Sequence, residues 1–132
     1  MSPENAAAVR RSLEAVLRGD FEAALAPMAD DVVWDDSYRP GGGVHKGHDG
    51  VRDANGSFFG TWRPGTYSLV VHEYVEAGDR VLARATQSGR GRSSGAEVTM
   101  DHFQVWTFRD GKAIEIQLFH EEAPALAAAG LK

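Results

Sequence analysis

The stretch VTMDHFQVWTFRDGKAIEIQLFH, residues 98–120, decides the fold of this chain. Both of its ends are rich in β-branched and aromatic residues, which favour extended strands. Between them stands the pair Asp110 and Gly111, which favours a tight two-residue turn between antiparallel strands. The stretch therefore predicts a β-hairpin with strands at 98–108 and 113–120.

Two further strands precede this hairpin. Residues 67–75 and 80–87 alternate between apolar and polar positions and are separated by a Gly-Asp turn. A glycine- and serine-rich segment at 89–95 then leads into the hairpin, and a shorter strand is predicted much earlier, at 32–34. Consecutive strands with short connections indicate an antiparallel sheet.

The N-terminal part has helical spacing instead. Apolar residues recur there every three or four positions and form one stripe: Val9, Leu13, Val16 and Leu17. Gly19 ends this first helix, Asp20 caps a short second one, a third is predicted at 48–59, and a last helical turn at 124–129. Helices followed by hairpin-connected strands indicate an α+β domain. We expect one domain over residues 1–132, in which N-terminal helices pack on a curved sheet and enclose a pocket.

Composition excludes several classes of function. The chain has 132 residues, a formal net charge of -5 and no Cys, so it has no disulfide, thiolate metal site or Cys nucleophile. An acidic chain without a Lys/Arg cluster is a poor binder of nucleic acid or of anionic membranes, because phosphates repel it. No stretch approaches the ~20 apolar residues that span a bilayer. We therefore expect a cytoplasmic protein that binds neither nucleic acid nor membranes.

The strand at 98–108 has apolar residues on both of its faces. Trp106 and Phe108 lie on one side, and Phe103 and Val105 lie on the other. If one face packs against the helices, the other is too apolar to leave in water. We expect a homodimer through the sheet face that carries Trp106 and Phe108. The alternative is that the third helix or the C-terminal tail covers that face.

Four short motifs carry a resemblance to a known family: Gly19-Asp20-Phe21, Ala29-Asp30-Asp31-Val32-Val33-Trp34, Lys46-Gly47-His48-Asp49-Gly50-Val51-Arg52 and Phe108-Arg109-Asp110-Gly111-Lys112. Their order and spacing resemble those of the nuclear-transport-factor-2-like superfamily, and within it those of the SnoaL-like branch of polyketide cyclases. The resemblance implies a mixed, mostly antiparallel sheet that forms a cone around an internal pocket. This superfamily hosts isomerases, cyclases, dehydratases, epoxide hydrolases and non-catalytic binding domains.

A second resemblance is to the ketosteroid isomerases of the same superfamily. Their general-base Asp is matched by Asp36, and their oxyanion-hole Asp, in an Asp-His-Phe triplet, is matched by Asp101. In the SnoaL-like cyclases a late-strand Asp acts as acid and base, and Asp101 matches that residue too. The isomerases' catalytic Tyr is matched by Ser12, and its supporting Tyr by Asn55. The resemblance implies proton transfer next to a carbonyl of a hydrophobic substrate, without a cofactor, with Asp36 as base and Asp101 as acid or oxyanion stabiliser.

Two other functions stay open at this point. The first is a non-catalytic binding or accessory domain with the same pocket, which the missing Tyr residues favour. The second is an epoxide or ester hydrolase, in which Asp and Arg groups hold a water molecule as in the limonene epoxide hydrolases. Arg52 or Arg84 would then supply the Arg.

The residues also indicate a wall for the pocket, with Asp101, Phe103, Ile116 and Leu118 from the sheet and with Trp34 and Asp36 opposite. A carboxyl group in an apolar pocket can donate to an oxyanion or accept a proton, and Asp101 shares its strand face with Phe103. The alternative places Asp101 near the strand start, in water or beside an Arg. His120 is either an acid/base at the pocket mouth or a half-exposed residue at the strand end. The expected ligand contacts are Trp34, Asn55, Phe59, Phe103, Ile116 and Leu118, and the catalytic candidates are Asp36, Asp101 and His120.

The other histidines carry no predicted chemistry. His45, His48 and Asp49 stand close together, but their spacing fits no metal motif, so we expect no metal. His102 is out of phase with Asp101, so we expect it on the opposite face of the sheet, toward the dimer contact.

Overall fold

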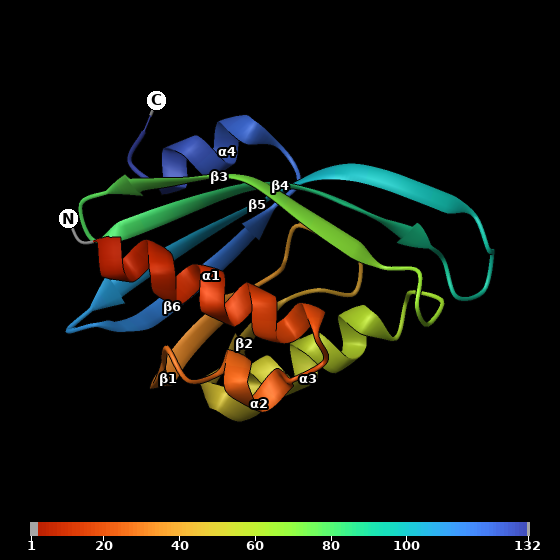
Figure 1. Ribbon diagram of the computed structural model, residues 1–132, viewed down its shortest axis with the longest axis horizontal. Helices are drawn as coiled ribbons and strands as arrows, with labels where there is room; N and C mark the ends of the chain where they lie inside the picture. Colours follow the sequence, from red (N-terminus) through yellow and green to blue (C-terminus); the bar gives the residue numbers. More distant parts are fainter. Residues whose placement is uncertain (1–2, 132) are drawn as a thin grey trace.

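The computed structural model describes residues 3–131 (Figure 1). Its elements are, in chain order, α1 (Pro3–Leu17), α2 (Phe21–Ala24), β1 (Met28–Asp35), β2 (Val44–Lys46), α3 (Gly47–Phe59), β3 (Ser68–Ala77), β4 (Arg80–Arg90), β5 (Glu97–Arg109), β6 (Lys112–Phe119) and α4 (Glu122–Ala128). The strands form one sheet in the order β2-β1-β6-β5-β4-β3. β1 runs parallel to β6, and the other neighbours run antiparallel. The predicted α+β class and the mixed, mostly antiparallel sheet are confirmed.

The sheet separates two helical layers of unequal size. Helices α1, α2 and α3 lie on one side of it, and α4 lies on the other (Figure 1). The larger cluster of buried apolar side chains includes Val9 of α1 and Ile116 of β6. A smaller cluster on the α4 side includes Val105 and Ala125. No helix in residues 3–131 has both the length and the apolarity that crossing a bilayer requires.

Local signals end the elements where the sequence predicts. Gly19 has a φ of +83°, in the left-handed region that suits a residue after a helix. The Ala23 N–H donates to the Asp20 carboxylate at 3.1 Å, which caps α2. Asp110 and Gly111 have φ values of 53° and 79°, as a tight two-residue turn requires. The predicted end of α1, the cap of α2 and the hairpin are therefore confirmed.

A β-bulge in β6 reverses the expected relation between the faces of β5 and β6. Next to the turn, Phe108 pairs with Ala113, but Thr107 then pairs with Glu115, so Ile114 is an extra residue without a partner on β5. The regular register of a two-residue hairpin would set Phe103 opposite Leu118. The bulge sets Gln104 opposite Leu118 instead.

A shift of one residue exchanges the two faces of a strand, because side chains alternate. Ile116 and Leu118 therefore share a face with Trp106 and Gln104. The expectation that Asp101 and Phe103 form one wall with Ile116 and Leu118 is wrong, and the unpredicted bulge is the physical reason.

The placement of the β5 faces also changes the argument for a dimer. Trp106 is fully buried and Phe108 is buried too, both in the cluster that the N-terminal helices cover. The expectation that these two residues form an uncovered sheet face is wrong. Helix α4 covers part of the other face, where Phe103 and Val105 lie. A homodimer stays a prediction, without this support.

Candidate functional site

A pocket lies between α1, α3 and the sheet face that they cover. The cavity itself has a volume of about 40 Å³, and about 500 Å³ of space lies between its walls when the part open to solvent is included. The apolar part of the wall consists of Leu13, Val16, Leu17, Trp34, Ala54, Phe58, Phe59, Leu69 and Leu118. The polar side chains in the wall are Asp36, Asn55, Tyr67, His102 and Gln104. Apolar walls with a few polar groups are typical of a site for a small organic molecule.

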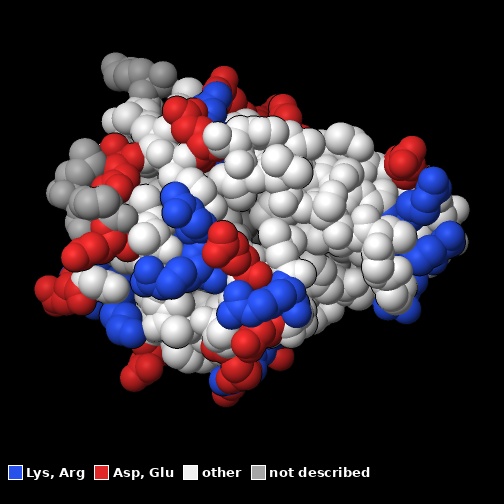
Figure 2. All heavy atoms as spheres, in the orientation of Figure 1, with Lys and Arg blue, Asp and Glu red and all other residues white. Residues whose placement is uncertain are grey.

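Charged side chains are spread unevenly over the face of the molecule that Figure 2 shows. They gather over α1 and α2 and at the tip of the β4–β5 hairpin, whereas few lie over the first half of β3 and the loop before it (Figure 2). The pocket takes Tyr67 and Leu69 from this charge-poor part of the chain. An approach with few charges suits an apolar ligand, because little polar surface has to lose water.

Several predicted site residues meet in the pocket. Trp34 comes from β1, Asn55 and Phe59 come from α3, and Leu118 comes from β6. Asp36, directly after β1, lines the same space. Segments that are far apart in the sequence thus bring these five side chains together. Their roles in binding stay predictions.

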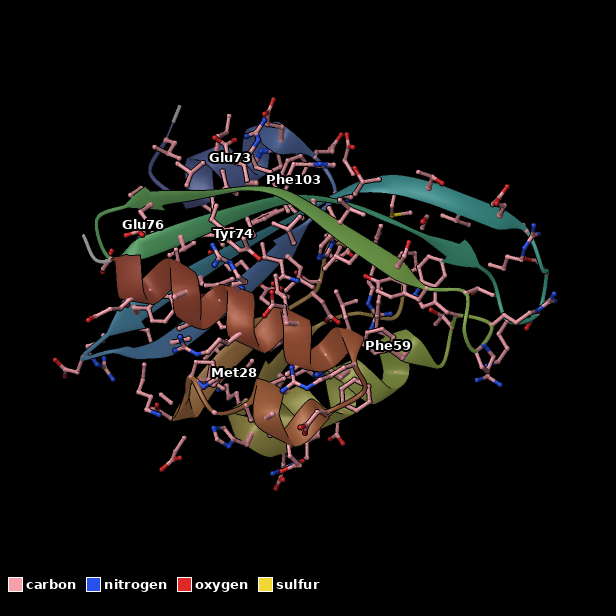
Figure 3. All side chains as sticks on the ribbon, in the orientation of Figure 1. Met28, Phe59, Glu73, Tyr74, Glu76 and Phe103 are labelled. Atoms are coloured by element: carbon pink, nitrogen blue, oxygen red, sulfur yellow. The ribbon has the colours of Figure 1, made fainter. Side chains whose placement is uncertain are left out.

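The other four predicted residues, Asp101 among them, lie elsewhere. Ile116 is buried in the core on the same side of the sheet but does not line the pocket. Phe103 lies on the α4 side, so its predicted ligand contact is wrong (Figure 3). His120 is exposed, and its ring lies 5.4 Å from the Tyr38 ring, in a neighbouring groove that shares Phe58 with the pocket. The interpretation of His120 as an exposed residue at the strand end fits this position.

Asp36 is a buried carboxylate that is surrounded by donors. Its side chain is only 2% exposed. Oδ1 accepts from the Gly43 N–H at 2.9 Å and lies 3.2 Å from His45 Nε2. Oδ2 accepts from Arg39 Nε at 3.2 Å and lies 3.0 Å from a terminal nitrogen of the same guanidinium. Three hydrogen-bond contacts occupy most of the about four lone-pair sites of the carboxylate, and Asp36 thereby fixes the loop between β1 and β2.

Asp101 does not reach the pocket. It is exposed and lies on the α4 side of the sheet, in a shallow depression beside His72, Arg84 and Glu122. Asp36 and Asp101 therefore occupy opposite sides of the sheet, and the expected pair of carboxylates in one cavity does not exist. The alternative of an Asp near water and an Arg describes its position.

Neither Arg considered for a hydrolase lies in the pocket wall. Arg52 donates to Glu22 at 2.8 Å and to Asp49 at 2.5 Å on the exposed side of α3. Arg84 pairs with Glu122 and lies on the α4 side of the sheet. A water held between Asp and one of these Arg residues in the pocket is therefore excluded for this arrangement of the chain.

His102 was expected outside the pocket, and the structure places it inside. The imidazole is 3% exposed and lines the pocket next to Gln104. Burial lowers the pKa of the His102 imidazole to about 4, because a charged ring would lose its hydration. The bulge at Ile114 is also the reason why the prediction for His102 is wrong, since no local signal in the sequence indicates this bulge.

The positions at which the isomerase resemblance expects Tyr have other roles here. Ser12 is buried, and its Oγ donates to the Ala24 carbonyl at 2.8 Å, which ties α1 to α2. Asn55 is buried and lines the pocket. A different tyrosine reaches the pocket: the Tyr67 hydroxyl donates to Gln87 at 2.8 Å, and burial raises its pKa. Tyr67 therefore adds a neutral aromatic ring to the wall.

The histidines near β2 bind other parts of the chain. His45 lies beside Asp36, His48 Nε2 lies 3.1 Å from the Met28 carbonyl oxygen, and Asp49 accepts from Arg52. Within residues 3–131, no three His, Asp or Glu side chains gather in a way that could hold a metal ion.

The fold and the pocket define the class: a nuclear-transport-factor-2-like domain with a helix-covered cavity. The chain belongs to the SnoaL-like domain family, whose model matches residues 9–116. None of the curated proteins matches the chain by sequence.

Solved structures with the same fold include proteins of related sequence. An NTF2-like protein of unknown function from Burkholderia pseudomallei is 30% identical, with 96% of this chain and 97% of that chain covered and a TM-score of 0.77. TerC, co-crystallised with polyporic acid, is 28% identical, with 97% of each chain covered and a TM-score of 0.76. A candidate SnoaL-like polyketide cyclase from Mesorhizobium loti is 20% identical, with 86% of this chain and 97% of that chain covered and a TM-score of 0.66, which shows the fold alone.

Proposed function

We propose that this chain binds a hydrophobic, ring-bearing small molecule with a carbonyl or hydroxyl oxygen in the pocket between α1, α3 and the sheet. The observation that carries the proposal is the distribution of side chains in that pocket. Aromatic and aliphatic residues form most of its wall, and a few buried polar groups, among them His102 and Gln104, lie on the sheet side. Such groups fix the orientation of a ligand whose affinity comes from apolar contact.

The apolar wall determines the expected strength of binding. Burial of about 200 Å² of apolar ligand surface contributes about 5 kcal/mol. Part of this free energy is offset by the lost freedom of the ligand. A small cyclic ketone is therefore expected to bind in the high micromolar to millimolar range, and a larger ligand more tightly. The co-crystallisation of TerC with polyporic acid makes that compound a reasonable probe for this chain too.

Binding is tested by quenching of tryptophan fluorescence, because Trp34 forms part of the pocket wall. The probes are polyporic acid, cyclic ketones such as 1-indanone, and phenols. Leu69→Trp fills the pocket and is expected to abolish binding. Val70→Trp is the matched control, since Val70 is 57% exposed and does not line the pocket. Binding that survives Leu69→Trp, or that no probe shows at millimolar concentration, contradicts the proposal.

A second candidate function is proton transfer next to the ligand's carbonyl, as in an isomerase or a cyclase that needs no cofactor. The buried Asp36 carboxylate in the pocket, with His45 beside it, favours this candidate. Asp101 has no part in it. For Asp36 to act as a base, the ligand has to displace one of the donors that now contact its oxygens.

Exchange of the protons next to the carbonyl of 1-indanone for deuterium, followed by NMR in D₂O, tests this second function. The wild-type chain is expected to accelerate the exchange over buffer. The double variant Asp36→Asn/Arg39→Gln, which leaves no unpaired buried charge, is expected to bind but not to accelerate. Exchange no faster than in buffer excludes proton transfer on this probe and leaves the binding function intact.

A further inference from the structure

We infer that His102 presents its Nδ1–H to an oxygen of the bound molecule, and that Trp106 and Gln104 hold the imidazole in the tautomer that can do so. This inference rests on the proposed binding function and adds the residue that selects a ligand oxygen. His102 contributes a neutral hydrogen-bond donor, and Gln104 and Trp106 are positioning residues.

The hydrogen bonds on one face of β5 determine the tautomer. The indole nitrogen of Trp106 is a donor only, and it donates to Gln104 Oε1 at 2.8 Å. The amide oxygen of Gln104 thus faces Trp106, and its amide nitrogen faces His102. Gln104 Nε2 lies 3.0 Å from His102 Nε2 and has to donate to it. A ring nitrogen that accepts carries no proton, so the proton of the neutral imidazole is on Nδ1.

The protonated nitrogen has no acceptor within residues 3–131. His102 Nδ1 is buried and makes no hydrogen bond to the chain. The nearest ring, that of Tyr38, has its centroid 6.4 Å from the imidazole. A buried donor without an acceptor costs free energy, and an acceptor that arrives with a ligand recovers it. His102 lines the pocket, so a ligand oxygen is the acceptor that the site lacks.

Three residues at alternating positions of one strand make this arrangement. His102, Gln104 and Trp106 point to the same face of β5, and all three are buried. The Trp106 ring has no exposed surface, so its N–H is fixed by packing in the core. The packing of Trp106 thereby sets the orientation of the Gln104 amide, and the amide sets the proton position on His102.

The tautomer is tested without any ligand, by ¹⁵N NMR of histidine-labelled protein at pH 7. The expected result is a His102 ring with protonated Nδ1 and unprotonated Nε2. Gln104→Glu replaces the amide donor by an acceptor and is expected to move the proton to Nε2. Gln117→Glu is the matched control, because Gln117 lies across from Val105 on the other face, and it should leave the tautomer unchanged. A wild-type ring with its proton on Nε2 overturns the inference.

Ligand selection is tested with 1-indanone and indane, which differ by one carbonyl oxygen in place of two hydrogens. The wild-type chain is expected to bind the ketone about tenfold more tightly, which corresponds to about 1.4 kcal/mol. In His102→Phe and Gln104→Glu, the ratio of the two affinities should fall to about one. His72→Phe, at an exposed His on the other face, should keep it.

The possible results separate the two proposals. Equal affinity of the wild-type chain for both compounds overturns the role of His102 and leaves the binding function standing. A tenfold preference for the ketone that persists in His102→Phe also overturns the role of His102 and leaves the binding function standing. Failure of the wild-type chain to bind these two compounds or any of the other probes at millimolar concentration contradicts the proposed function, and the inference about His102 falls with it, even where NMR finds the proton on Nδ1.

Discussion

Between Asp101 and Trp106, both faces of strand β5 combine apolar and polar residues, yet they have different surroundings. On one face, His102, Gln104 and Trp106 are buried beneath the N-terminal helices. On the other face, Phe103 and Val105 pack near α4, and Asp101 lies in water. Composition therefore does not decide which face carries the site. The register against β6 decides it, because that strand supplies Leu118 to the pocket wall.

Insertion of one residue between Glu115 and Ile116 is the strongest way to break this difference. Because the pairing beyond the bulge is regular, one added residue there would turn Ile116 and Leu118 away from the core. Loss of the burial of two such side chains costs about 3–6 kcal/mol, at about 1.5–3 kcal/mol each. Ile114→Thr keeps the number of residues and is expected to cost far less, about 1 kcal/mol. Urea unfolding of both variants measures the difference, and equal midpoints would show that the register between β5 and β6 does not hold Ile116 and Leu118 in the core.

The two aspartates should respond very differently to the same substitution. Asp36→Asn removes the buried carboxylate that pairs with the partly buried Arg39 guanidinium and is expected to cost about 3 kcal/mol of unfolding free energy. Asp101→Asn changes an exposed side chain and should stay within about 0.5 kcal/mol of wild type. Chemical unfolding at pH 7 compares them. A large cost for Asp101→Asn would place that residue in a contact that the structure does not contain.

Lower pH is expected to decrease the unfolding free energy of the chain through His102, on the pocket side of the sheet. Burial lowers the pKa of His102 to about 4, below the ordinary value of 6.5, so the unfolded chain binds a proton more readily than the folded one. The stability is fully present above pH 6.5 and falls by about 3 kcal/mol as the pH drops to 4. The charged group in the pocket wall, Asp36, is paired with Arg39.

The measurement is the unfolding free energy of wild type and His102→Phe between pH 7 and pH 4. The variant should lose about 3 kcal/mol less than wild type over this range. His72→Phe removes an exposed histidine on the other face and should follow the wild-type curve. Parallel curves for wild type and His102→Phe would mean that the imidazole is not buried as a neutral ring.

Ion pairs on the α4 side should contribute least to the unfolding free energy. Arg84 pairs with Glu73 and Glu122, whose side chains are 60% and 49% exposed. Pairs so exposed contribute about 0–1 kcal/mol, and salt screens them. Arg84→Gln is expected to lower the unfolding free energy by less than about 1 kcal/mol, and by less still in about 1 M NaCl. A cost near that of Asp36→Asn would remove the contrast between the two faces.

Most of the fold could be predicted because its signals are local. The stripe of α1, the cap at Asp20 and the turn at Asp110 and Gly111 each depend on a few neighbouring residues. The short strand β2 (Val44–Lys46) was missed, because three residues next to a glycine run form a strand only through pairing with β1. The parallel contact between β1 and β6 joins distant parts of the chain, and only the family resemblance indicated a mixed sheet.

The site was predictable only in part, for the same reason. Trp34 and Asp36 could be assigned to the pocket from the strand that they continue, and Asn55 and Phe59 from the third helix. His102 and Gln104 could not, because their face depends on the unpaired Ile114 in the neighbouring strand. A bulge at that place reflects the packing of the whole sheet and leaves no pattern in the sequence.

The unpaired residue in β6 also has an evolutionary consequence. Straightening of this bulge at an unchanged strand length, or gain of a codon that no bulge absorbs, is enough to exchange the residues that face the cavity with those that face away. Two homologues can share an identical Asp-His-Phe triplet and yet expose different chemistry to a ligand, an acid in one and an imidazole in the other. Within this superfamily, alignment of catalytic motifs is informative only when strand lengths are aligned with them.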